Sequence, residues 1–289
     1  MARSVTALAI ILFASSWAWA EDLPPPVAGD EEEGLTLEEA FSWKTSGTGQ
    51  LGDRAEIGIP LDHRFLDGAE ASRLLTEMGN ISDGDELGLI GSDELEWFVI
   101  FFFDDIGYVQ DDEKDELDAD ALAETIRENL EYSNQIREER GLMTMQFAGW
   151  AMEPRYNENN QQLEWASRLS SLDGDVVNYN TRVLGRKGVM RVILVTDPSE
   201  LEATLPQFNS VMQNFRFLDG ERYAQYTAGD KIAEYGLVAL IAGGAGALAV
   251  KTGLFASLLV FLKKGFKFVI LGLVAVGAAV KKVFSRRTA

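Results

Sequence analysis

The feature that most constrains this chain is its C-terminal region, where an acidic sequence becomes apolar and basic. Residues 236–250 (GLVALIAGGAGALAV) and 268–280 (FVILGLVAVGAAV) carry no charged side chain, and lysines and arginines flank both runs. A soluble domain has little surface with which to cover two such runs so close together. We therefore expect residues 231–289 to anchor the chain in a lipid bilayer. The alternative is a detached amphipathic pair of helices in a soluble protein.

Each apolar run is short for a membrane span. The 15 residues of 236–250 make about 22 Å of helix, against a hydrocarbon core of roughly 30 Å. Two arrangements are open: a hairpin in which both runs span, which we prefer, or one span with the second run along the interface. Ala239, Gly243 and Ala247 recur every four residues, a spacing that lets membrane helices pack closely.

The N-terminus is typical of an exported protein. Arg3 precedes an apolar stretch, and Ala18 and Ala20 have the small-x-small form of a signal-peptidase site. We expect residues 1–20 to be a cleaved signal peptide and residues 21–35, which are rich in proline and acid, to be a disordered leader. The main domain, residues 36–230, then lies in the periplasm or otherwise outside the cytoplasm, and the anchor lies in the cytoplasmic (inner) membrane.

Composition excludes several classes of function. The net charge is −20, and because the tail is basic, the exported part is more negative still. Such a surface repels nucleic acid. The sequence has no cysteine, which excludes disulfides, zinc–thiolate sites, iron–sulfur clusters and thiol nucleophiles.

The domain has the sequence pattern of an α+β fold with a mainly antiparallel sheet covered by helices. Residues 96–103 (EWFVIFFF) predict a central buried strand, residues 119–140 a helix, and residues 175–184 and 189–196 a hairpin. Strands are also predicted at 51–60, 144–151, 162–170 and 215–217, and helices at 69–78 and 197–214, with Pro206 dividing the last helix and Thr204 capping its second piece.

Four blocks in combination carry a family resemblance: GDVVNYNTRVLGRKGVMRVILVTDP (174–198), EWFVIFFFDDIGYVQDDEKDELDAD (96–120), LEWASRL (163–169) and GDKIAEYGLVALIAGG (229–244). They resemble bacterial membrane-anchored proteins of domain of unknown function 2167. The resemblance implies an exported domain with a C-terminal anchor, and it brings no catalytic or ligand residues. The strand–helix–Phe-Arg-Phe ending also resembles the α/β/α sandwich of the photosystem II extrinsic oxygen-evolving protein, a likeness of fold that carries no activity.

The predicted hairpin gathers cations and amides in an otherwise acidic domain. Alternation places three polar side chains of the first strand on one face, and further cations follow in the turn and the second strand. These side chains could bind an anion or an acidic partner, or the arginines could pair with neighbouring carboxylates. The residues are Asn178, Asn180, Arg182, Arg186, Lys187 and Arg191.

Acidic side chains after the predicted central strand are candidate metal ligands. Asp104, Asp105, Asp111 and Asp112 form a dense oxygen cluster that a divalent cation would stabilise. The alternative is a solvated acidic loop that precedes a helix. No other cofactor is expected. Residues 83–94 match a calcium loop in part, but Leu87 stands where an oxygen ligand is needed.

Two further motifs do not predict a functional site. His63 is the only histidine, and no GxSxG elbow accompanies it, so a surface role is favoured over catalysis. Residues 47–52 match GxGxxG but no predicted strand precedes them, and a flexible glycine loop is expected instead.

These observations predict a non-enzymatic binding or interaction module in the periplasm. Its expected partners are the lipid bilayer and another envelope protein. The alternatives are a metal-dependent enzyme that uses the acidic loop 104–115, and an accessory subunit of a membrane transport or secretion complex.

Overall fold

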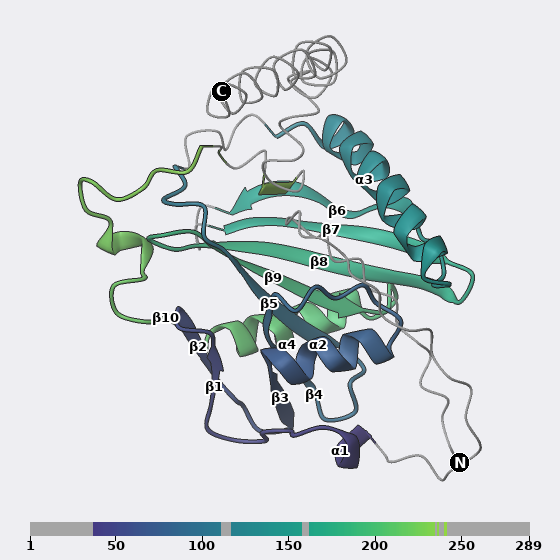
Figure 1. The fold of residues 1–289 in the computed structure, drawn as a ribbon, viewed down its shortest axis with the longest axis horizontal. Coiled ribbons are helices and arrows are strands. Elements are labelled where there is room, and N and C mark those ends of the chain that lie inside the picture. Colours follow the sequence, from purple (N-terminus) through teal and green to yellow (C-terminus); the bar gives the residue numbers. More distant parts are fainter. Residues whose placement is uncertain (1–36, 111–116, 158–161, 235, 237–239, 242–289) are drawn as a thin grey trace, which may run out of the picture. The chain divides into compact units, whose positions relative to one another are not determined.

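The computed structural model describes residues 37–110, 117–157, 162–234, 236 and 240–241 (Figure 1). The predicted signal peptide, the acidic leader and most of the predicted anchor lie outside these residues, as do Asp111, Asp112, Ala239, Gly243 and Ala247. No helix in the described part of the chain is both long enough and apolar enough to cross a bilayer.

Strands outnumber helices, and four of the strands follow one another directly before the last long helix. The elements are α1 (Leu37–Ala40), β1 (Thr48–Leu51), β2 (Ala55–Gly58), β3 (His63–Asp67), α2 (Gly68–Glu77), β4 (Glu86–Ser92), β5 (Phe98–Asp104), α3 (Ala119–Glu139), β6 (Gln146–Asn157), β7 (Gln162–Ser171), β8 (Gly174–Leu184), β9 (Val189–Thr196), α4 (Leu201–Met212) and β10 (Phe215–Phe217), followed by a 3-10 turn at Tyr223–Gln225.

These strands form two sheets. The larger one has seven strands in the order β3-β4-β5-β9-β8-β7-β6, and every neighbouring pair is antiparallel. The smaller one has the order β1-β2-β10 and is also antiparallel. The fold is thus α+β with mainly antiparallel sheets, as the sequence predicts.

Helices α2 and α3 lie on one face of the larger sheet, and α4 and the smaller sheet on the other (Figure 1). Leu74 of α2 and Ile126 of α3 pack with Ile100 of β5 in one apolar core. Phe208 of α4 and Ile57 of β2 belong to a second core on the opposite face. Because both faces are covered, β9 (VMRVILVT) is buried along its whole length.

The helix 201–212 corrects one sequence prediction. Pro206 lies inside α4 and does not divide it, and Thr204 caps nothing: its hydroxyl lies 3.3 Å from that of Thr196. Proline at this position removes one hydrogen bond, to the carbonyl of the exposed Glu202, where water can replace it. Asp197, where the predicted helix 197–214 begins, lies before α4 and accepts a hydrogen bond from the Ser199 amide at 2.7 Å.

The predicted strand 51–60 is a hairpin, and this also corrects the glycine-loop interpretation of residues 47–52. Strand β1 lies within those residues and pairs with β2, and Gly52 makes the turn with a φ of 61°. A Cβ on Gly49 would lie 2.7 Å from the Phe65 ring. That glycine therefore serves packing and not flexibility.

Strand β6 ends the larger sheet and is irregular. Its pairing with β7 contains three register shifts, between Phe147 and Gly149, Trp150 and Met152, and Met152 and Arg155. Gly149 has a φ of 120°. Helix α3 packs beside this strand and its Ala119 carbonyl accepts a hydrogen bond from the Trp150 indole at 3.2 Å. The strand is consequently bent and partly covered.

Candidate binding site on the main sheet

Four of the six predicted binding residues lie on one face of the seven-stranded sheet. Asn178, Asn180 and Arg182 alternate along β8, and Arg191 of β9 stands directly opposite Arg182. Ile193, the partner of Asn180, shares this face and belongs to the core that α2 and α3 cover. The polar side chains alternate onto one face as expected, but all four are more than nine-tenths buried.

Arg191 is held by two carboxylates. Its Nη2 lies 3.1 Å from Oδ2 of Asp85, just before β4, and its Nε lies 3.0 Å from Oδ1 of Asp104 at the end of β5. Its guanidinium also lies 4.5 Å from the ring centroid of Phe102. Burial raises the pKa of Asp85 above its ordinary value, although Arg191 acts in the opposite direction. The charge of Arg191 is thus balanced within the fold.

Arg182 has no counter-ion in the described part of the chain. Its Nη1 donates a hydrogen bond to the Thr181 carbonyl oxygen at 3.3 Å, its Nε has no partner, and its guanidinium lies 4.5 Å from the ring centroid of Trp165. Burial lowers the pKa of Arg182 to about 9, with a further lowering from Arg191 that Asp104 opposes. A buried cation without a partner is unfavourable, so this side chain is a candidate for a functional role.

Of the two amides beside Arg182, that of Asn178 has an unsatisfied oxygen. Nδ2 of Asn180 donates to the Asn178 carbonyl oxygen at 2.9 Å. Oδ1 of Asn178 is buried and has no hydrogen-bond partner. A buried amide oxygen in this state is an acceptor that a ligand's N–H or O–H group can fill.

Arg186 and Lys187 lie in the β8–β9 turn and have a different role. Arg186 binds Asp230 through two hydrogen bonds of 2.7 and 2.9 Å, and the ammonium of Lys187 binds Glu221. Arg186 holds the pKa of Asp230 well below its ordinary value. The turn cations thus fix the segment that follows β10, as in the ion-pairing alternative.

The predicted metal ligands are dispersed where they can be placed. Asp104 contacts Arg191, and Asp105 contacts Arg54 at 2.9 Å. The described residues contain no group of three or more histidine, cysteine, aspartate or glutamate side chains suited to a metal ion. His63 begins β3, where its Nδ1 lies 2.7 Å from the Leu61 carbonyl oxygen.

Two residues of the site were not among the predicted ones. Trp165 of β7 is paired with Asn180 and thus lies on the same face; the alternation of LEWASRL places it there. Glu86 of β4 is paired with Phe102, is almost fully buried, and accepts a hydrogen bond from the Ser82 hydroxyl at 2.9 Å. Burial raises the pKa of Glu86.

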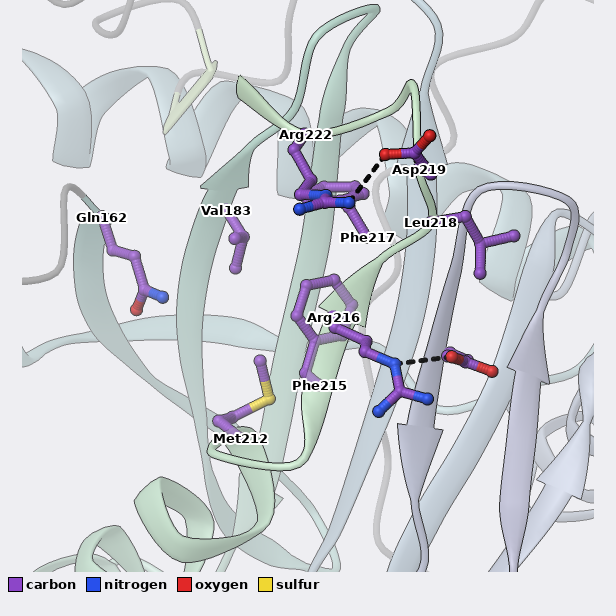
Figure 2. Close-up of a pocket in the computed structure, with 10 residues that line it drawn as sticks. Gln162, Val183, Met212, Phe215, Arg216, Phe217, Leu218, Asp219 and Arg222 are labelled. Atoms are coloured by element: carbon purple, nitrogen blue, oxygen red, sulfur yellow. Dashed lines mark hydrogen bonds and ion pairs between the residues drawn. The ribbon is translucent and has the colours of Figure 1, made fainter. Parts of the chain in front are cut away.

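A hollow of about 580 Å³ lies beside β10 (Figure 2). Phe215, Phe217 and Met212 give it an apolar lining. Its arginines are neutralised: Arg216 lies 2.6 Å from Glu56, and Arg222 lies 2.7 Å from Asp219. This hollow therefore offers less to a charged ligand than the Arg182 face does.

Comparisons with known proteins match a family model and solved structures. The model of the family described as "Protein of unknown function (DUF2167)" matches residues 43–277. No curated protein matches the chain. The solution structure of cyanobacterial PsbP (CyanoP) from Synechocystis sp. PCC 6803 is similar at 12% identity and a TM-score of 0.38, over 67% of this chain and 99% of that chain.

Proposed function

We propose that this chain, which belongs to the family described as protein of unknown function (DUF2167), is a binding module that recognises an anionic group. The observation that carries the proposal is Arg182, whose guanidinium is buried and has no counter-ion among the residues that the structure describes. A carboxylate or phosphate would supply the missing charge through paired N–H···O bonds. Trp165 would pack against the ligand or hold the guanidinium plane in place.

The spacing of the polar groups restricts the ligand. Asn178 and Arg182 are four residues apart on one strand, which corresponds to about 13 Å. A ligand that meets both would carry its anionic group at one end and an N–H or O–H donor at this distance. An extended peptide or another elongated polar molecule has these dimensions.

We place this module outside the cytoplasm, tethered to the cytoplasmic membrane by residues 231–289. The signal-peptide pattern of residues 1–20 and the apolar runs 236–250 and 268–280 support this placement. In such a position the acidic domain faces the envelope space, and its partner would be another envelope protein or a solute there.

We propose binding and not catalysis. His63, the only histidine of the chain, lies on β3, three strands away from β9. A metal-dependent enzyme that uses loop 104–115 is less well supported, because Asp104 and Asp105 each pair with an arginine. An accessory subunit of a transport or secretion complex is compatible with the proposed site, whose ligand would then be that complex.

The test uses full-length protein in mild detergent with a panel of carboxylates, phosphates and acidic peptides. We expect at least one of them to raise the melting temperature of the wild type and of Arg168→Met, a matched change at a half-exposed arginine that pairs with Asp175. The same compound should not change the melting temperature of Arg182→Met.

Two results would contradict the proposal. One is a ligand response that survives in Arg182→Met. The other is the absence of any response, together with crosslinking of partners in intact membranes that is identical for wild type and Arg182→Met.

A further inference from the structure

A small aromatic patch lies on the segment that leads toward the apolar C-terminal run. The ring of Tyr108 stacks on that of Tyr223 and lies at a tilt of 36° to that of Tyr226, with centroid distances of 4.4 and 4.3 Å. Tyr226 is 38% exposed and Ile232 is 40% exposed, so both present apolar surface to the outside. We call Tyr108, Tyr223, Tyr226 and Ile232 the tyrosine patch.

The patch is fixed to the domain. Arg186 binds Asp230, the Tyr108 amide donates to the Lys231 carbonyl oxygen at 2.8 Å, and the Ala233 amide donates to the Tyr108 carbonyl oxygen at 2.9 Å. Tyr108 and Ile232 are thus joined by a parallel bridge. The backbone pairing of this segment with Tyr108 extends to Ala233.

Little chain separates this fixed point from the apolar run. Ile232 precedes Gly236, the first residue of the run 236–250, by four residues. Four residues reach at most about 14 Å when fully extended. If the hydrocarbon core begins at Gly236, Ile232 must lie within that distance of it, which brings the patch to or next to the headgroup layer.

We propose that the tyrosine patch lies against the lipid headgroups and seats the domain directly on the bilayer. The inference rests on the membrane tether proposed above. Tyrosine suits this layer because its ring is apolar and its hydroxyl remains in a polar environment. Lys231, exposed beside the patch, can contact lipid phosphates.

Single cysteines test this placement cleanly because the sequence contains none. Full-length Tyr226→Cys and Ile232→Cys are labelled with nitrobenzoxadiazole and reconstituted in vesicles of phosphatidylcholine and phosphatidylglycerol. We expect the label at either position to emit further to the blue, and to be quenched several-fold more by a nitroxide-labelled lipid, than a label at a control position.

The control is Leu172→Cys. Leu172 is 95% exposed and lies in the β7–β8 turn, at the opposite end of β8 from the turn that holds the patch. Flotation of the vesicles separates the two possible failures. If the protein floats but the patch labels behave like the Leu172 label, the patch proposal is wrong and the tether stands. If the protein does not float, both are wrong.

Discussion

Arg182 and Arg191 face each other across the β8–β9 pair, and only Arg191 is ion-paired with carboxylates. Like charges directly opposite on neighbouring strands destabilise a sheet. At Arg191, Asp85 and Asp104 offset this effect, whereas at Arg182 the described residues offer only the Trp165 ring and a backbone carbonyl. Equivalent substitutions at the two positions should therefore change stability in opposite directions.

Arg182→Met should raise the free energy of unfolding by roughly 1–3 kcal/mol, because an apolar side chain of similar length replaces an unpaired buried charge. Urea unfolding of the ligand-free protein measures the change. A loss of stability would mean that the contacts with Trp165 and Thr181 outweigh the cost of burying the charge, and would weaken the case for a functional role.

Arg191→Met should lower the free energy of unfolding by about 1–3 kcal/mol, since it leaves the carboxylates of Asp85 and Asp104 without their partner. The same urea titration serves as the measurement. A neutral result would show that water replaces the guanidinium at both carboxylates.

Glu86→Gln should stabilise the protein increasingly as the pH rises above 4.5. Burial raises the pKa of Glu86 from that ordinary value, so the folded state retains a proton that the unfolded state releases. The stability that protonated Glu86 contributes is fully present below its ordinary pKa, and it is lost as the pH rises toward the raised pKa of the folded state. Glutamine does not titrate. A difference between variant and wild type that stays constant with pH would exclude this assignment.

Arg186→Gln should release the segment around Asp230 and make Lys231 cleavable by trypsin several-fold faster. The charge exchange Arg186→Asp with Asp230→Arg should restore resistance. Because Arg186 lowers the pKa of Asp230, the stabilisation from this contact is complete above the ordinary value of 3.8, and it is fully lost only when the pH falls through the lowered pKa. Equal trypsin rates in Arg186→Gln and wild type would argue against the contact.

Gly188→Ala should destabilise the protein by about 1–3 kcal/mol through overpacking. A Cβ at this position would lie 2.0 Å from the backbone oxygen of Asp104, the residue that holds Arg191. Gly58→Ala is the control, because its Cβ would make an ordinary contact of 3.4 Å with Asn214, and should change stability by less than about 1 kcal/mol. Thermal unfolding of the two variants compares them directly.

Much of the fold could be predicted because the sequence signals are local. The apolar run 96–103 predicts β5, the helical stripe of 119–140 predicts α3, and the turn 185–188 predicts the hairpin of β8 and β9. The predictions of a helix divided at Pro206 and of a flexible glycine loop before β2 were wrong, because tertiary packing overrides local propensity at both places.

The site was harder to predict. Alternation in β8 indicates which side chains share a face, but it cannot tell whether that face is covered, and so the burial of Arg182 was missed. The partners of Arg191 could not be predicted either. Asp85 is 106 residues away in sequence, and only the strand order β4-β5-β9 brings the two residues together. Contacts of this range depend on topology, which a single sequence does not encode locally.

The irregular register of β6 affects whether copies of this protein can associate through the edges of their sheets. A straight outer strand would let the sheet of one copy continue into that of the next, the first step of uncontrolled association. The three shifts, the unusual backbone at Gly149 and the cover from α3 leave no regular row of donors and acceptors for such growth. Two copies of this protein that meet at β6 can therefore separate again without joining their sheets at this edge.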